Sequence, residues 1–202
     1  MGFQRIFLSS IILALTLSSI VSADDVLISS PHVTNWGDWG EVEKCPVGSF
    51  VFGYKLKVQP GGGVLNDDTA LNGIELLCIT PTKRHNATQD KALTPISSSV
   101  GHAGDFGQIL ECPEPGYVVG FQLRSEPNQL LYDDSAANDL KLMCSTGETL
   151  EGYGDPIFGD WTEPQRCPRS TLVCGIQTQV ESDGQMDNTS LNNVNMVCCD
   201  SA

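Results

Sequence analysis

Paired acidic residues occur at corresponding places in the 202-residue sequence and are the side chains best suited to chemistry. Two places read Asp-Asp-Thr and Asp-Asp-Ser, and a third reads Asp-Asn-Thr; the residues are Asp67, Asp68, Asp133, Asp134, Asp187 and Asn188. Glycosyl chemistry uses two carboxyl groups, one as the acid and the other as nucleophile or base. The four aspartates of the first two pairs are therefore the candidate catalytic residues.

The same positions also have a structural interpretation, which we favour. An Asp at a turn accepts hydrogen bonds from nearby backbone N–H groups. An Asn lies five residues after the first Asp each time, at Asn72, Asn138 and Asn192, and would fix its local backbone similarly. Catalysis seldom needs three copies. Calcium is a lesser alternative, because carboxylate and amide oxygens suit it, but the EF-hand spacing is missing. We predict no metal and no cofactor.

These corners belong to a longer pattern that the chain repeats three times. Each copy has a Gly-Asp-aromatic turn, a Cys-Pro, a Gly eight residues after that Cys, the acidic corner and a closing Cys. Fixed offsets with variable residues between them mark a repeated structural unit. We expect copies over about residues 36–78, 104–144 and 158–199, within one domain from 24 to 202.

Short strands separated by turns are the secondary structure that this repeat predicts. Apolar residues alternate towards the end of each copy, as at Ile74, Leu76 and Cys78, and alternation is typical of a half-buried antiparallel strand. Gly, Pro, Asp and Asn cluster between such segments. Each copy supplies about one four-stranded sheet, which is too little to bury a core alone. The sequence therefore predicts an all-β protein of three sheets around a pseudo-threefold axis.

The N-terminal residues and the cysteines indicate an exported protein. Arg5, an apolar run and the small residues before position 24 are typical of a signal peptide over residues 1–23. The eight cysteines of an exported chain predict four disulfides. Because the cysteines recur in each copy, we favour bonds that each link two cysteines of one copy. The third copy has four cysteines, and there the alternative pairing, in which Cys198 and Cys199 exchange partners, stays open. The favoured pairs are Cys45–Cys78, Cys112–Cys144, Cys167–Cys198 and Cys174–Cys199.

Charge limits the partners. The formal charge is −14, and it becomes −15 when Arg5 is removed with the signal peptide. Nucleic acids and anionic membranes require clustered Lys and Arg, so the sequence excludes both as partners. No second apolar span follows the signal peptide, and the mature protein is expected to be secreted and extracellular.

Aromatic residues and sequons are the remaining candidates for a role in glycan chemistry. Trp36 and Tyr132 have no aromatic counterparts in the other copies, and we regard them as candidates for stacking on sugars. Trp39, Phe106 and Trp161 are equivalent in the repeats, so we expect them to pack in the core. Of two sequons, Asn86 is the expected glycosylation site.

The sequence resembles the vitelline membrane outer layer protein 1 family. The shared marks are Trp-Gly-Asp-Trp-Gly at 36–40, the Cys-Pro pairs, Asp-Asp-Thr-Ala-Leu-Asn-Gly at 67–73, and the terminal Cys198-Cys199. The resemblance implies a β-prism of three Greek-key sheets, secreted as a structural component of an egg coat or mucosal layer among matrix proteins. Two alternatives follow from it: transfer between N-acetylglucosamine oligosaccharides, and carbohydrate binding without catalysis.

Overall fold

The computed structural model describes residues 25–59, 70–85, 93–127, 136–154, 158–182 and 189–201. Apart from one short helix, α1 (Pro81–His85), the regular elements described are β-strands. Within those residues no helix has the length and apolar character needed to cross a membrane. The expected signal peptide lies outside the described residues, as do the acidic residues of the three corners.

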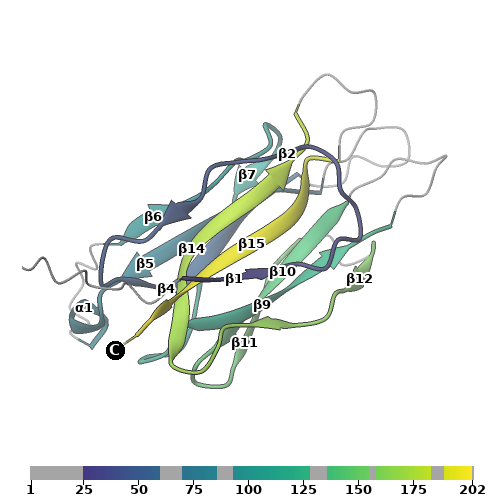
Figure 1. Ribbon diagram of the computed structural model, residues 1–202. Coiled ribbons are helices and arrows are strands. Elements are labelled where there is room, and N and C mark those ends of the chain that lie inside the picture. Colours follow the sequence, from purple (N-terminus) through teal and green to yellow (C-terminus); the bar gives the residue numbers. More distant parts are fainter. Residues whose placement is uncertain are drawn as a thin grey trace, which may run out of the picture.

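Three long antiparallel hairpins form the body of the molecule, one from each copy of the repeat (Figure 1). They are β4 (Phe50–Val58) with β5 (Leu71–Ile79), β9 (Val118–Ser125) with β10 (Ala137–Cys144), and β14 (Thr171–Val180) with β15 (Leu191–Asp200). The residues that alternate in the sequence point inwards from these strands, and the intervening residues point outwards.

Short strands complete each hairpin into a sheet. Sheet A adds β1 (Val26–Ser29), β2 (Asp38–Trp39) and β3 (Glu43–Lys44) to β14 and β15. Sheet B adds β6 (Thr94–Ile96), β7 (Asp105–Phe106) and β8 (Leu110–Glu111) to β4 and β5. Sheet C adds β11 (Thr149–Glu151), β12 (Asp160–Trp161) and β13 (Gln165–Arg166) to β9 and β10. The predicted all-β prism of three sheets is confirmed.

The sheets do not coincide with the sequence copies, which corrects the expectation of one sheet per copy. Asp38 and Trp39 pair with β14 of the third copy, although β4 is the next long strand along the chain. The equivalent segments of the other two copies pair with the preceding hairpin in the same way. In each copy the short strands before the Cys-Pro belong to one sheet, and the long strand after it belongs to the next. Each Cys-Pro turn therefore crosses the seam between two sheets. The N-terminal strands thereby complete the C-terminal sheet.

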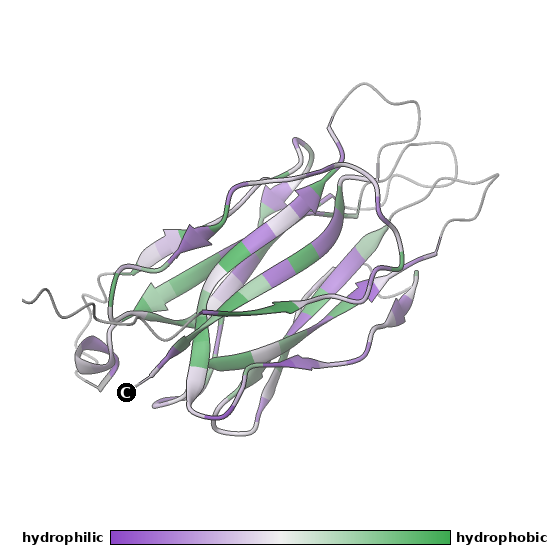
Figure 2. Ribbon diagram, in the orientation of Figure 1, coloured by the Kyte–Doolittle hydropathy of each residue, from purple (hydrophilic) through white to green (hydrophobic). Residues whose placement is uncertain are grey.

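The core lies between the inner faces of the three sheets. Its buried residues come from all three hairpins and include Tyr54, Leu76, Phe121, Leu142, Ile176 and Met196. Figure 2 shows apolar and polar residues alternating along β14 and β15. Tyr54 carries the one hydroxyl among these six, and it donates to the carbonyl of Leu140 at 2.9 Å across the core. Burial, and to a lesser extent the negative charge of Asp139, raises the pKa of Tyr54 well above its usual range.

The repeated glycine after each Cys-Pro has a packing role. A Cβ at Gly53 would lie 2.6 Å from the carbonyl oxygen of Leu110 on β8, and one at Gly175 would lie 2.8 Å from that of Glu43 on β3. Gly120 has the same close approach to Gln165. The edge strand can therefore approach the hairpin only where no side chain is present.

The disulfides have the expected pairing: Cys45–Cys78, Cys112–Cys144, Cys167–Cys198 and Cys174–Cys199. Each bond links one copy, as expected, but three of them also join two sheets, because the copies do not coincide with the sheets. Cys45 donates its N–H to Cys174 at the edge of sheet A, while Cys78 belongs to β5 of sheet B. The second bond likewise joins sheet B to sheet C, and the third joins sheet C to sheet A. Only the fourth bond, Cys174–Cys199, lies within one sheet.

Candidate functional site

The corner asparagines act on their own backbone, in agreement with the structural interpretation. Asn72, Asn138 and Asn192 are fully buried. Each side-chain amide donates to the carbonyl two residues earlier, at 3.4, 3.5 and 3.3 Å respectively. The catalytic candidates Asp67, Asp68, Asp133 and Asp134 lie outside the described residues, as do the sugar-binding candidate Tyr132 and the sequon residue Asn86.

Trp36, the other predicted sugar-binding residue, is half-buried. Its backbone N–H donates to Oδ1 of Asn192 at 3.2 Å, so its main chain fastens the N-terminal segment to the third corner. It does not line the groove that is described below.

The three repeat-equivalent aromatic residues lie on the outer faces of the sheets, which corrects the expectation that they pack in the core. Trp39 is 36% exposed and Phe106 is 38% exposed, while Trp161 is partly exposed. They sit on the edge strands β2, β7 and β12, opposite Gln179, Lys57 and Arg124. Repeat equivalence fixed the same strand position in each copy, but the long hairpins supply most of the core.

Cations cover two of these aromatic rings. Lys141 Nζ lies 4.0 Å from the centroid of the Trp161 ring, with Arg124 at 5.9 Å. Lys55 Nζ lies 5.6 Å from the centroid of Phe106. No lysine or arginine in the described part of the chain lies over Trp39, whose ring neighbour is the exposed His32 at 6.4 Å. Trp39 is thus the member of the set whose ring is available to a ligand.

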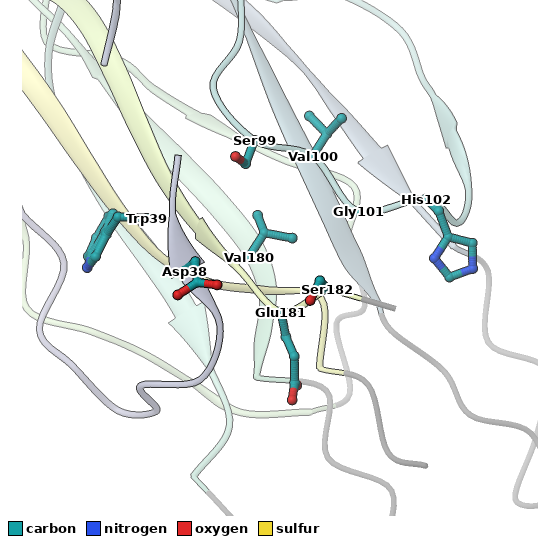
Figure 3. A pocket seen from close by; sticks show the side chains of 9 residues that line it. All are labelled: Asp38, Trp39, Ser99, Val100, Gly101, His102, Val180, Glu181 and Ser182. Carbon is teal, nitrogen blue, oxygen red and sulfur yellow. The ribbon is translucent and has the colours of Figure 1, made fainter. Parts of the chain in front are cut away.

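A groove of about 360 Å³ lies beside Trp39, where the edge of sheet A meets the segment that follows β6 of sheet B. Its lining residues are Asp38, Trp39, Ser99, Val100, Gly101, His102, Val180, Glu181 and Ser182. Figure 3 shows Trp39 and His102 on opposite sides, with the two valines between them. The lining therefore offers an aromatic ring, an apolar floor, two carboxylates, two hydroxyls and an imidazole.

Small residues keep this seam open. Ser98 and Ser99 pack against Gly40, where a Cβ would collide with them. At the seam between sheets B and C, Tyr153 packs against the equivalent Gly107. Its hydroxyl accepts from the N–H of Leu56 at 3.2 Å and donates to the carbonyl of Gln108 at 2.9 Å. A tyrosine therefore fills the second seam at the place that serines occupy in the first.

The two carboxylates of the groove differ in what they bind. Glu181 accepts from Thr189, at 3.1 Å from the backbone N–H and 2.7 Å from the hydroxyl, so it holds the third corner. Asp38 is exposed, and no hydrogen bond or ion pair joins its carboxylate to another described residue. Asp38 is therefore the carboxylate that can accept bonds from a ligand.

The arrangement was only partly visible in the sequence. The segments that enter the two seams differ in sequence. The segment before Gly104 reads Ser-Ser-Ser-Val at 97–100, and the segment before Gly159 reads Glu-Gly-Tyr-Gly at 151–154. That difference separates an open seam from a closed one, but only once sheets of adjacent copies are known to share a seam. The sequence did not single out Trp39 as the uncovered ring, because the equivalent residues of the other two copies are also aromatic.

Comparison with known proteins places this geometry in context. The family model described as vitelline membrane outer layer protein I matches residues 26–201. The human vitelline membrane outer layer protein 1 homolog is 40% identical over 169 residues, covering 81% of this chain and 78% of that protein. The mouse homolog is 38% identical over 175 residues, covering 83% of this chain and 81% of its own length.

Solved structures confirm the architecture. Calystegia sepium agglutinin matches with a TM-score of 0.53 at 10% identity, over 86% of this chain and 95% of the agglutinin. The Calsepa lectin in complex with a biantennary N-glycan matches with a TM-score of 0.55 at 10% identity, over 87% and 96% of the two chains. Identity this low establishes a shared fold alone. The family match and the mammalian relatives establish more: the chain belongs to the vitelline membrane outer layer protein I family.

Proposed function

We propose that this protein is a secreted structural component of an extracellular coat, which attaches to glycans of that coat through the groove beside Trp39. Its relatives are named for the outer layer of the vitelline membrane. A solved neighbour with the same fold is a lectin in complex with an N-glycan. Other coat or matrix proteins would be its neighbours in such a layer.

The observation that carries the proposal is the availability of Trp39 at the rim of an open seam. Sugar sites combine an aromatic face, which stacks on the apolar face of a pyranose ring, with a few polar groups that bond its hydroxyls. Trp39, Asp38 and the serines all line this groove, so it offers both kinds of group to successive units of a glycan chain. At the other two aromatic positions a cation already lies over the ring.

The covalent frame suits a protein that must last outside the cell. Three disulfides connect sheet A to B, B to C and C to A, so the ring of sheets is closed covalently. Disulfides of this kind persist in oxidising compartments and limit the unfolded ensemble.

Binding of N-acetylglucosamine hexamer, followed by native mass spectrometry and calorimetry, tests the proposed site. Trp39→Ala is expected to weaken binding at least tenfold, because stacking on the ring is lost. Trp161→Ala removes the equivalent aromatic residue of sheet C and is the matched control, with binding expected to stay within about twofold. Equal losses in the two variants, or no binding by the wild type to either the N-acetylglucosamine hexamer or the glucosamine hexamer, would contradict the proposal.

The same incubation separates binding from turnover. Unchanged hexamer on the protein supports a binding role. Longer and shorter oligosaccharides appearing together would instead establish a transferase and direct mutagenesis to Asp67, Asp68, Asp133 and Asp134.

A further inference from the structure

The groove presents negative charge towards its ligand. Asp38 and Glu181 line it, and neither lysine nor arginine is among its lining residues. Lys57, which lies near its floor, donates from Nζ to the carbonyl of Gly101 at 2.7 Å and to that of His102 at 3.0 Å. That ammonium group is therefore directed to backbone oxygens. With a formal charge of −14 on the whole chain, the surrounding field also attracts cations.

The position of Asp38 on its strand sets the form of the ligand. Asp38 and Trp39 are consecutive residues of β2, so their side chains leave opposite faces of the strand. Figure 3 shows the Asp38 carboxylate on the side of Val180, while the Trp39 ring points away from Glu181 and Ser182. One sugar ring cannot stack on Trp39 and also bond Asp38, but successive units of an oligosaccharide can reach both.

We infer that the groove recognises an extended amino-sugar chain that carries free, protonated amines, with a unit stacked on Trp39 and the ammonium group of another unit bound by Asp38. This inference rests on the proposed glycan-binding function and specifies its ligand. An ammonium group donates charge-assisted hydrogen bonds to a carboxylate, which are stronger than bonds from a neutral hydroxyl or acetamide. A sulfated or carboxylated chain would meet like charge in the same place and is disfavoured.

Calorimetric titration with glucosamine hexamer at pH 5.5, where its amines are protonated, tests the inference. Asp38→Asn is expected to weaken binding about tenfold, the size of loss typical for one hydrogen bond to a charged group. Asp105→Asn and Asp160→Asn are matched controls, because each removes one charge from the equivalent strand position of another sheet. Both are expected to change the affinity less than twofold. Glucosamine monomer is expected to bind far more weakly than the hexamer.

The outcomes separate this inference from the proposed function. Equal weakening by all three Asn variants would mean attraction by net charge alone and would overturn the inference. Tighter binding of N-acetylglucosamine hexamer than of glucosamine hexamer would overturn it too, while leaving the groove as a glycan site. If a hexalysine peptide binds as tightly and loses as much affinity with Asp38→Asn, the ligand is a basic peptide and the inference fails. If neither hexamer binds, the proposed function itself fails.

Discussion

Cys45 and Cys78 are joined by a disulfide that crosses the seam between sheet A and sheet B, with their Cα atoms 5.7 Å apart. The bond lies on the same seam as the groove, and Cys78 packs in the central core. It therefore connects two sheets whose relative position determines whether the groove exists.

Replacing both residues, as Cys45→Ala with Cys78→Ala, is expected to lower the free energy of unfolding by about 3–4 kcal/mol, the chain-entropy value for a loop of this length. The loss also frees sheet A from sheet B at their shared seam. Urea denaturation measures the first effect, and hydrogen exchange of the amides in β4 and β14 measures the second.

The bond Cys174–Cys199 provides the control, because it encloses a loop of similar length but joins two strands that are already paired in sheet A. Its removal is expected to cost a comparable free energy by chain entropy without faster exchange at the seam. If both double variants leave seam exchange unchanged, the inter-sheet role of Cys45–Cys78 is wrong.

Much of the fold was predictable because it depends on local patterns. Alternation at Ile74, Leu76 and Cys78 gave the strands, and fixed offsets gave three copies. The identity of each sheet was not predictable in this way, because the partner of β2 is set by the closure of the ring, which involves residues about 140 positions away such as Gln179. Because of the same closure, three of the disulfides that link one copy also join two sheets.

The candidate site was harder to predict for a related reason. Trp39, Phe106 and Trp161 are equivalent in sequence, and only the side chains on the neighbouring strands distinguish them. Lys141 reaches Trp161 from β10, whereas the corresponding residue of sheet A is Asn195, which donates to Gln177 at 3.0 Å. Asn195 and Gln177 are neutral and bond to each other, so they leave the ring of Trp39 uncovered. The motif that the copies share does not include this position, so it could not predict which ring is covered.

Closing the groove is expected to abolish glycan binding without unfolding the protein. Ser99→Tyr introduces, beside Gly40, the residue type that fills the other seam beside Gly107. Calorimetry with N-acetylglucosamine hexamer should then show at least a tenfold loss, while the melting temperature stays within about 3 °C. Ser99→Ala is the control and should retain binding. Retained binding in the tyrosine variant would place the site elsewhere.

Arg84 is expected to be a strong determinant of stability although it is charged. Its side chain is fully buried, its guanidinium lies 4.4 Å from the centroid of Phe52, and it donates to the carbonyl of Cys112. Arg84→Ala should lower the free energy of unfolding by about 3 kcal/mol, because a buried carbonyl loses its donor and a cavity is left. Lys83→Ala, at the exposed neighbouring position, should change it by less than about 0.5 kcal/mol in the same urea titration. Similar effects in the two variants would contradict the anchoring role of Arg84.

Asp139 is expected to make the stability of the protein dependent on pH. It is 4% exposed, and burial raises the pKa of its carboxyl, although the N–H groups of Leu140 and Gly154 act in the opposite direction. The charge of Glu151 adds to the rise in this pKa, and that of Arg124 reduces it. The folded state therefore favours the protonated form more than the unfolded chain does.

The sign of the pH effect follows from linkage. A carboxyl group whose pKa is raised on folding contributes stability that is complete below its unfolded pKa and is lost as the pH rises through its folded pKa. Asp139→Asn keeps the side-chain oxygen that accepts from Leu140 at 2.7 Å and removes the buried charge. Sheet A already carries Asn193 at the corresponding position. The variant should therefore melt at a higher temperature than the wild type at pH 7, and the gain should shrink towards pH 3.5. A gain that is the same at both pH values would show that the charge of Asp139 is not its cause.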